Sequence, residues 1–497
     1  MKRKRLKLRM ENSPAGFCSA SGIYKSPWSS SLPLPSSPPL SLPHFLLSSS
    51  HRRSKPAFID AVSGETVTYD DLFSLTTATS RALMAAGIHH GDVVLLVSPN
   101  SIFFPALSLG IMAAGAVFST ANHLLTRREL LAQVEDSRPV LILTTAELRP
   151  KLEGLIPLPP LLIDQFLSTL PTLRKPDCAA AAGLDRPAAL MYSSGTTGRS
   201  KGVVCTHRNL VAVAAVLRLV WGAAPPPREK EVAVAAGCDD VYLCVVPLFH
   251  MFGFSVFVCG AIAAGAAVVV MRRYSLEGML AAVEQLRVTR MSAVPPMSAV
   301  PPMVVQLARA GHVAEGYDIR SLREVICSGA PLATEHMARF GACYPEIILS
   351  QCYRLTETSG PLTLCDGLIG RTHASIGRLI PSIEAKIVDA RTGSALSPNR
   401  LGELCVRGPP VMKGYLNSPE ATSLAIDEQG WLHTGDLCYV DTCGLVYVVD
   451  RIKELIKYKA YQVAPAELEE VLSTHPDIED VAVISHSDEE VGEVPLA

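Results

Sequence analysis

The chain has 497 residues, which is enough for two or three domains with a large buried core. Its 45 basic and 47 acidic side chains nearly balance, so no global charge indicates a nucleic-acid-binding protein. The 13 cysteines are spread out without a CxxC pair or a compact framework, which is typical of reduced thiols in an intracellular protein.

Residues 1–55 differ in composition from the rest of the chain. The run MKRKRLKLR is strongly basic, a Ser/Pro-rich stretch follows it, and Glu11 is the only acidic residue before Asp60. Such a segment cannot form much packed core. We expect a disordered extension here, and a transit peptide or a nuclear-type basic cluster are the alternatives.

A globular pattern begins at residue 56 and alternates strands with helices, which predicts a largely parallel sheet. A strand–turn–strand unit is expected around Ser63-Gly64. Residues 157–171 are rich in Leu and Pro and are expected to form loops. Strands are expected at 92–97 and 140–144, and helices at 74–86, 102–115 and 127–135.

Residues 192–203 read YSSGTTGRSKGV and lie between two apolar flanks. Glycines allow the backbone to approach a ligand closely, and successive amides and hydroxyls can form a nest for anionic oxygens. Lys201 adds a mobile positive charge, although it does not directly follow the second glycine as in a Walker A loop. The predicted polyphosphate contacts are Ser193, Ser194, Gly195, Thr196, Thr197 and Lys201.

A helix over 210–221 and a strand over 241–247 are expected next, and this strand leads into PLFHMFGF. The nearly charge-free segments 102–121 and 254–271 approach the length of a membrane span. Glycines divide both segments. We therefore expect a buried helix ending near Gly265, then a buried strand, and no stable membrane span.

The hexapeptide MSAVPP occurs twice in tandem, at 291–296 and 297–302. Extra loop residues cost little entropy, so a real insertion and an error in the gene model both stay open. Residues 375–450 are strand-rich with Gly turns, as in a small antiparallel barrel or sheet. The other elements expected are helices at 304–310, from 333 and at 464–472, and strands at 322–328, 347–350 and 478–485.

Seven motifs follow one another in a fixed order: YSSGTTGRSKGV, PLFHMFGF, SGAPL, QCYRLTET, GELCVRG with VMKGYLN, GWLHTGDL and DRIKELIKYKAYQVAPAELE. This order resembles the adenylate-forming superfamily of acyl-CoA synthetases, and most closely the plant 4-coumarate–CoA ligase-like proteins. The resemblance implies an α/β fold with a large N-terminal domain of two helix-flanked sheets plus a small β-barrel, here 56–450. A small and here incomplete α+β C-terminal domain would follow over 451–497.

The resemblance also implies a two-step ligase reaction. A carboxylate attacks the α-phosphate of Mg-ATP to give acyl-AMP and pyrophosphate, and the thiol of coenzyme A then expels AMP. The first step crowds anions together, so it needs cations and hydrogen-bond donors more than a base. The strings GELCVRG and HMFGFSV resemble the ligase-like branch, whose acids include cinnamates, fatty acids and jasmonate precursors.

Each motif implies roles for particular residues. Glu357 resembles the magnesium-binding glutamate, since a hard cation takes oxygen ligands. Asp436 resembles the carboxylate that holds the ribose, with Arg451 as its partner, and His250 the histidine that guides the acyl carboxylate. Further adenylate contacts implied are Thr356, Gln351, Cys352 and Gly329.

Roles are also implied near the C-terminus. Lys453 resembles the hinge at which the small domain rotates. Lys457 and Gln462 resemble residues that reach the adenylate after that rotation. Lys459 and Arg273 are expected to meet the phosphates of coenzyme A.

The sequence departs from the family pattern at several points. Cys352 and Arg354 replace the glycines of QGYGLTE, and Arg354 must point outward or enter the acyl pocket. There it could occupy acyl space or pair with a carboxylate of a long substrate. Ala460 replaces a glycine, at a cost of about 1 kcal/mol if a positive φ is required.

The sequence stops at Ala497, before a PKTPSGK-type stretch whose lysine serves adenylation in the family, so we expect a truncated chain. The competing hypothesis is a non-catalytic remnant that binds ATP or acyl-adenylate. The expected compartment is the cytoplasm, with the peroxisome as the alternative if the full-length chain carries a targeting tripeptide.

Overall fold

The computed structural model describes most of the chain. The segments described are 16–28, 41–48, 53–171, 183–193, 200–221, 240–293, 303–309, 316–329, 334–365, 375–458, 461–473, 481–488 and 492–497, with the single residues 314, 332, 475 and 478. Three features singled out in the sequence lie outside the described residues: most of the repeated MSAVPP, the centre of the glycine-rich loop, and Ala460.

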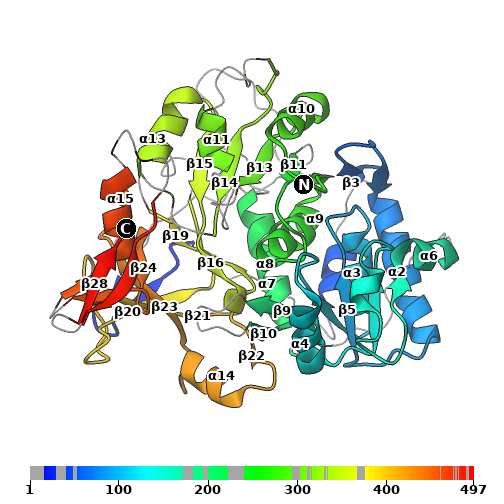
Figure 1. The fold of residues 1–497 in the computed structure, drawn as a ribbon, viewed down its shortest axis with the longest axis horizontal. Coiled ribbons are helices and arrows are strands. Elements are labelled where there is room, and N and C mark those ends of the chain that lie inside the picture. Colours follow the sequence, from blue (N-terminus) through cyan, green and yellow to red (C-terminus); the bar gives the residue numbers. More distant parts are fainter. Residues whose placement is uncertain are drawn as a thin grey trace, which may run out of the picture.

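Two seven-stranded sheets form the larger part of the molecule (Figure 1). The first has the order β22-β10-β9-β6-β5-β7-β8, parallel from β9 to β8 and antiparallel at β9-β10-β22. Its strands are β5 (Val93–Val97), β6 (Val117–Thr120), β7 (Leu141–Thr144), β8 (Leu161–Leu162), β9 (Pro187–Ser193), β10 (Lys201–Thr206) and β22 (Gly414–Tyr415).

The second sheet has the order β15-β14-β13-β11-β12-β3-β4 and is parallel except at β4. Its strands are β3 (Pro56–Asp60), β4 (Thr66–Thr68), β11 (Val241–Cys244), β12 (Ala267–Val270), β13 (Arg290–Ala293), β14 (Glu324–Cys327) and β15 (Ile348–Gln351). Strand–helix alternation therefore produces parallel sheets, as predicted.

Helices cover these sheets (Figure 1). A capping box at Thr68 and Asp71 starts α2, and another at Thr126 and Glu129 starts α4. Helix α3 is buried on every side, which explains its apolar sequence. The helices are α2 (Tyr69–Ala85), α3 (Phe104–Ala113), α4 (Arg127–Ser137), α5 (Arg149–Leu152), α6 (Ile163–Thr169), α7 (His207–Trp221), α10 (Leu276–Leu286), α11 (Met303–Arg309) and α13 (Thr334–Cys343).

The apolar stretch 251–271 folds as a buried helix followed by a strand, as predicted. It consists of α8 (Met251–Gly253), the π-helix η1 (Phe254–Gly260) and α9 (Ala261–Ala264). Gly265 ends the helix with φ +72°, a conformation that favours glycine, and β12 follows. None of the helices in the described residues is long and apolar enough to cross a membrane.

A six-stranded antiparallel sheet occupies the place of the predicted barrel, in the order β1-β2-β20-β21-β23-β24. Its strands are β1 (Phe17–Cys18), β2 (Ile23–Lys25), β20 (Glu384–Val388), β21 (Gly402–Arg407), β23 (Leu432–Val440) and β24 (Val446–Arg451). Helix α14 (Pro419–Ala425) lies at the bottom of Figure 1. The 3-10 helix η2 (Thr356–Thr358) lies between the paired strands β16 (Arg354–Leu355) and β17 (Gly360–Pro361). A second short pair, β18 (Thr363–Leu364) with β19 (Arg378–Leu379), follows it.

The C-terminal residues form a separate four-stranded sheet with one helix, at the left of Figure 1. Its order is β26-β25-β28-β27. The elements are β25 (Ile456–Tyr458), β26 (Tyr461–Val463), α15 (Pro465–Ser473), β27 (Ile484–Asp488) and β28 (Gly492–Leu496). The α+β composition agrees with the prediction for this part of the chain.

Three expectations need correction. Residues 1–55 were expected outside the fold, but β2 pairs with β20, and Tyr24 is buried. Helix α1 (Leu42–Leu47) is also buried and packs against α3 and α7. Residues 157–171 are not only loops, because they include β8 and α6. The strand expected from residue 478 is placed at Ile484–Asp488, where β27 pairs with β28.

Candidate active site

The carboxyl ends of β14 and β15 lie side by side, because Cys327 pairs with Gln351. Ligands in open α/β sheets bind at such an edge. Gly329 follows β14 with φ +115°, which favours glycine, and the buried Gln351 ends β15. The backbone N–H of Cys352 donates to the Cys327 carbonyl at 3.0 Å, and burial raises the pKa of the Cys352 thiol. The structure thus brings together three predicted adenylate contacts.

The predicted phosphate loop connects β9 to β10. Ser193 and Lys201 face each other at the open end of this hairpin, and the hydroxyl of Ser200 donates to the Ser193 carbonyl. The loop itself, with Ser194, Gly195, Thr196 and Thr197, lies outside the described residues. The hairpin therefore positions both loop ends.

Tyr415 on β22 joins Lys201 to the predicted magnesium ligand. The Lys201 Nζ lies 5.0 Å from the centre of the Tyr415 ring, and the Tyr415 hydroxyl donates to Glu357 Oε1 at 2.9 Å. Burial, followed by the negative charge of Glu357, raises the pKa of Tyr415. Among the described residues nothing donates to the second carboxylate oxygen of Glu357, so this oxygen suits a hard cation. The adjacent Thr356 is buried.

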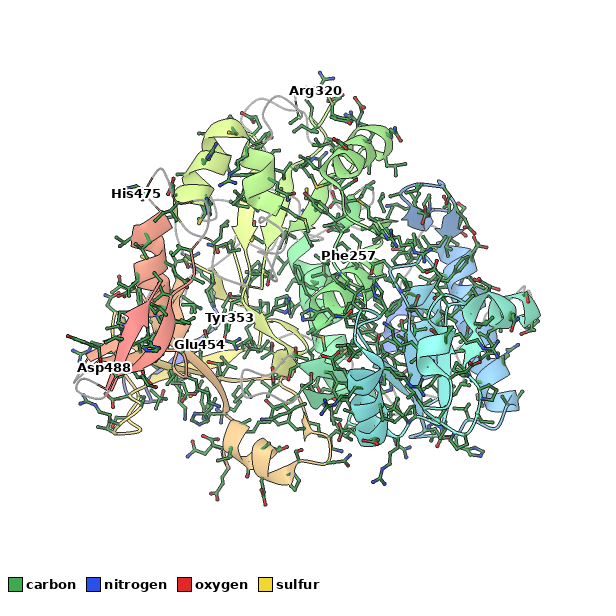
Figure 2. The ribbon with its side chains drawn as sticks, in the orientation of Figure 1. Phe257, Arg320, Tyr353, Glu454, His475 and Asp488 are labelled. Atoms are coloured by element: carbon green, nitrogen blue, oxygen red, sulfur yellow. The ribbon has the colours of Figure 1, made fainter. Side chains whose placement is uncertain are left out.

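The predicted ribose site centres on Asp436, whose residue is only 3% exposed. The Tyr353 hydroxyl donates to Asp436 Oδ2, and Arg451 Nε lies 3.3 Å from Asp436 Oδ1. Figure 2 labels Tyr353 toward the middle of the view and Glu454 on the side of the C-terminal elements. Burial raises the pKa of Asp436 against the opposing effects of Tyr353 and Arg451, and Glu454 and Glu357 raise it further. Asp436 is a buried carboxylate within the electrostatic range of Glu357.

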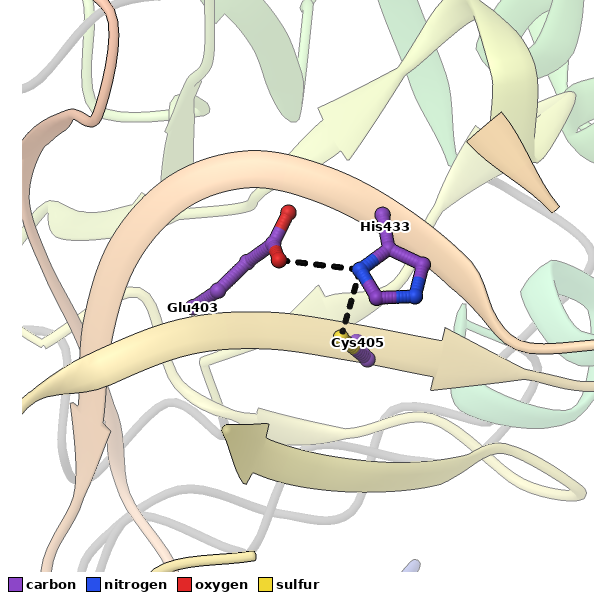
Figure 3. A group of neighbouring side chains, drawn as sticks. All are labelled: Glu403, Cys405 and His433. Atoms are coloured by element: carbon purple, nitrogen blue, oxygen red, sulfur yellow. Dashed lines mark hydrogen bonds and ion pairs between the residues drawn. The ribbon is translucent and has the colours of Figure 1, made fainter. Parts of the chain in front are cut away.

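A cluster of Glu403, Cys405 and His433 fixes the turn before Asp436 (Figure 3). Glu403 Oε1 accepts a hydrogen bond from the Gly435 N–H at 3.1 Å, and Glu403 Oε2 lies 2.9 Å from His433 Nδ1. The Cys405 Sγ lies 3.4 Å from the same ring nitrogen. Glu403 therefore spans β21 and β23 and holds the backbone that presents Asp436.

His250 caps the start of α8, where its Nδ1 accepts a hydrogen bond from the Phe252 N–H at 3.3 Å. Burial, with a smaller effect from the Arg354 charge, lowers the pKa of His250 to about 3. The ring is therefore neutral at ordinary pH and carries its proton on Nε2. A neutral N–H donor of this kind can orient a carboxylate without neutralising it.

The sequence left open whether Arg354 points outward or inward. In the structure its side chain, on β16, points inward. The guanidinium carbon lies 4.5 Å from the centre of the Phe252 ring. Phe252 connects Arg354 to His250, because its ring faces the guanidinium and its N–H donates to the His250 ring. The charge of Arg354 also contributes to the lowered pKa of His250.

Several predicted residues are not brought to this site by any contact between described residues. Arg273 is exposed on the loop after β12, and Lys453 is exposed in the turn after β24. Lys457 and Gln462 pair across β25 and β26. Lys459 lies outside the described residues.

Tyr353 and Tyr415 were missed by sequence reasoning, although QCYRLTET and VMKGYLN contain them. Their position inside ordered motifs was the available signal. Nothing in the local pattern said which carboxylate each hydroxyl would reach, since each bond joins residues far apart in the chain.

The chain belongs to the AMP-binding enzyme family, which matches residues 47–416. More narrowly, it groups with plant 4-coumarate–CoA ligase-like proteins, as the motif order predicted. It is 47% identical to a putative 4-coumarate–CoA ligase-like 8 of Oryza sativa subsp. japonica, over 97% of this chain and 88% of that protein. It is 39% identical to the peroxisomal OPC-8:0-CoA ligase 1 of Arabidopsis thaliana, over 98% of this chain and 88% of that protein.

The fold also matches a solved structure of the family. The o-succinylbenzoate coenzyme A synthetase of Bacillus subtilis, in complex with ATP and magnesium, superposes with a TM-score of 0.75 at 28% identity, covering 89% of this chain and 86% of that one. Family and relatives together class this chain as an acid–thiol ligase.

Proposed function

We propose that this protein is an ATP-dependent carboxylic acid–CoA ligase. It joins a carboxylate to the α-phosphate of ATP, releases pyrophosphate, and transfers the acyl group from acyl-AMP to the thiol of coenzyme A with release of AMP. Acids of the cinnamate, fatty or jasmonate-precursor type are the proposed substrates. The related structure with ATP and magnesium supports both cofactors.

The observation that carries this proposal is the pairing of unlike groups from distant parts of the chain. Lys201 and Glu357 meet at Tyr415, which suits a magnesium-bound triphosphate. Asp436 offers buried carboxylate oxygens that suit the two ribose hydroxyls. The neutral His250 suits the reacting carboxylate.

The remaining proposed groups come from the C-terminal residues and from Arg273 on the loop after β12. Lys457 and Gln462 would approach the adenylate after rotation at Lys453, and Lys459 and Arg273 would meet the phosphates of coenzyme A. We propose the cytoplasm as the compartment and the peroxisome as the alternative, because one relative is named peroxisomal.

The test is an adenylation assay on the purified chain. ATP, magnesium and a panel of acids are supplied, pyrophosphate release is followed, and hydroxylamine traps the acyl-adenylate as a hydroxamate. Pyrophosphate and hydroxamate in equal amounts, for at least one acid, are the expected result. ATP binding without pyrophosphate release for any acid would contradict the ligase proposal.

A second candidate function is binding of ATP or acyl-adenylate without turnover. The inward-pointing Arg354 favours it, because a guanidinium takes up space that a glycine would leave open. The same assay separates the two, since this candidate predicts nucleotide binding in the absence of both products.

A further inference from the structure

Arg354 has a buried guanidinium nitrogen, and its positive charge has no partner among the described residues. Its Nε is buried and has no hydrogen-bond partner among the described residues, although the residue as a whole is half-buried. None of the carboxylates in the described segments forms an ion pair with it. Its contact is with the face of Phe252. A cation on an aromatic face is attracted to the ring but keeps its full charge.

Among the described residues, neither Cys352 nor Glu324 neutralises Arg354. Burial raises the pKa of the Cys352 thiol, so this thiol is uncharged at neutral pH. Glu324 is already engaged, because its carboxylate lies 3.3 Å from Arg290 and accepts from Ser350 at 2.6 Å. Burial lowers the pKa of Arg354 to about 10, which still leaves the guanidinium protonated at neutral pH.

An unpaired buried cation is costly, and a bound anion relieves that cost. A guanidinium is suited to a carboxylate because its N–H groups match the two oxygens. Arg354 therefore has the properties of half an ion pair whose other half is a ligand.

The location of Arg354 indicates which part of the ligand it meets. Phe252 donates its N–H to His250, and the ring of the same residue carries the guanidinium. His250 is the group proposed for the reacting carboxylate. Arg354 thus lies beside the acyl end of the site, whereas Glu357, three residues further along the chain, accepts a hydrogen bond from Tyr415.

We propose that Arg354 selects acids that carry a second anionic group, so that the preferred substrates are dicarboxylic acids rather than simple monocarboxylic ones. This inference rests on the proposed ligase function. One carboxylate is activated near His250, and the second pairs with the guanidinium of Arg354.

The first experiment varies the substrate on the unaltered protein. A chain-length series of α,ω-dicarboxylic acids is compared with the monomethyl esters of the same acids, together with 4-carboxycinnamic acid and its 4-methyl ester. Each ester keeps the shape and removes the second charge. We expect pyrophosphate release with a kcat/KM about 10- to 100-fold higher for the best diacid than for its ester.

The second experiment varies the residue. Arg354→Met removes the charge at similar length, Arg354→Lys keeps it, and Arg354→Gly restores the family residue. Exposed Arg81→Met is the matched control. Arg354→Met should abolish the preference by lowering diacid turnover alone, Arg354→Lys should keep part of it, and Arg81→Met should leave it unchanged.

Stability and binding give readouts that do not depend on turnover. Since Arg354 has no ion-pair partner among the described residues, Arg354→Met should have an equal or higher Tm, whereas loss of a structural arginine would lower it. Isothermal titration calorimetry of the diacid, without ATP, should show binding that Arg354→Met weakens.

The possible outcomes separate this inference from the proposed function. Equal or better turnover of the esters, unaffected by Arg354→Met, would overturn the inference and leave the ligase intact. Diacid binding that depends on Arg354, without pyrophosphate release from any acid, would keep the inference for the binding site and refute the ligase. If Arg354→Met fails to fold, the ester comparison and Arg354→Lys decide.

Discussion

At the scale of single residues, two tyrosines hold the two carboxylates on which the candidate site depends. Tyr353 donates to Asp436, and Tyr415 donates to Glu357. Each hydroxyl donates to its carboxylate and fixes its direction, so the acid groups are oriented before a ligand arrives. Such preorganisation lowers the cost of binding.

Asp436→Asn is expected to weaken ATP binding by about 10- to 100-fold, because a neutral amide replaces the charged acceptor of the ribose hydroxyls. Titration of a fluorescent ATP analogue measures the change. Asp164→Asn, on the exposed start of α6, is the control and should bind normally. Unchanged affinity of Asp436→Asn would remove Asp436 from the nucleotide site.

Glu357→Gln is expected to raise the magnesium concentration for half-maximal pyrophosphate release by about 10-fold or more. The amide keeps an acceptor for Tyr415 but loses the charge that a hard cation requires. A magnesium titration of the adenylation rate measures this effect. Tyr415→Phe is the companion variant, since it removes the hydrogen bond and keeps the carboxylate. A normal magnesium requirement in Glu357→Gln would contradict the metal role.

At the scale of elements, α1 is attached to the core through His207 at the start of α7. The Leu42 N–H donates to the Nδ1 of His207 at 3.2 Å, and Arg218 on the same helix lies 5.0 Å from the centre of the Phe45 ring. Burial lowers the pKa of His207 to about 4. A segment with a composition typical of disorder is thereby held in the fold.

His207→Phe is expected to lower the free energy of unfolding by about 1–3 kcal/mol at pH 7, because the Leu42 N–H loses its acceptor. Wild-type stability should also fall as pH drops from about 6.5 towards about 4, since only the unfolded chain then binds the proton. This contribution amounts to about 3 kcal/mol and should be missing in His207→Phe.

Urea unfolding at pH 7 and at pH 4.5 measures both effects. The loss of stability at pH 4.5 is compared between wild type and His207→Phe. This comparison is needed because His250, whose pKa is also lowered, contributes a further loss of stability at acid pH in both proteins. Exposed His89→Gln is the control and should follow the wild type. If the free energy of unfolding depends on pH in the same way in His207→Phe and wild type, His207 is not the source of the pH dependence.

At the scale of the whole molecule, the C-terminal sheet is more weakly attached than the two large sheets. Every residue of β27 is exposed, whereas four of the five residues in β5 are buried. Few buried apolar groups support β27, so local opening should cost little there. This difference fits a unit that moves relative to the rest.

Hydrogen exchange on the full chain should therefore show amides of β27 exchanging at least about 100-fold faster than amides of β5. Peptide-resolved mass spectrometry measures both in one sample. Strand β21, which is paired on both sides, is the internal control for an antiparallel strand with a slow rate. Equal protection of β27 and β5 would show that the C-terminal sheet is firmly packed.

The sequence by itself determined the family, the alternation of strands and helices, and most of the candidate residues. These features rest on local information: glycines where a loop approaches a ligand, apolar runs where strands are buried, and motifs in a fixed order. Gly265 ends its helix where the sequence placed the end. Lys201 and Glu357, named from separate motifs, both contact Tyr415, and the role of each stays a prediction.

Only the tertiary structure decided which groups meet. Tyr24 and Leu42 enter the core because distant β20 and His207 offer them partners, which no composition reveals. Arg354 points inward because Phe252 accepts its guanidinium, where the sequence left both directions open. The physical reason is the same in each case: the energy of a buried polar or aromatic group depends on neighbours that are remote in the chain.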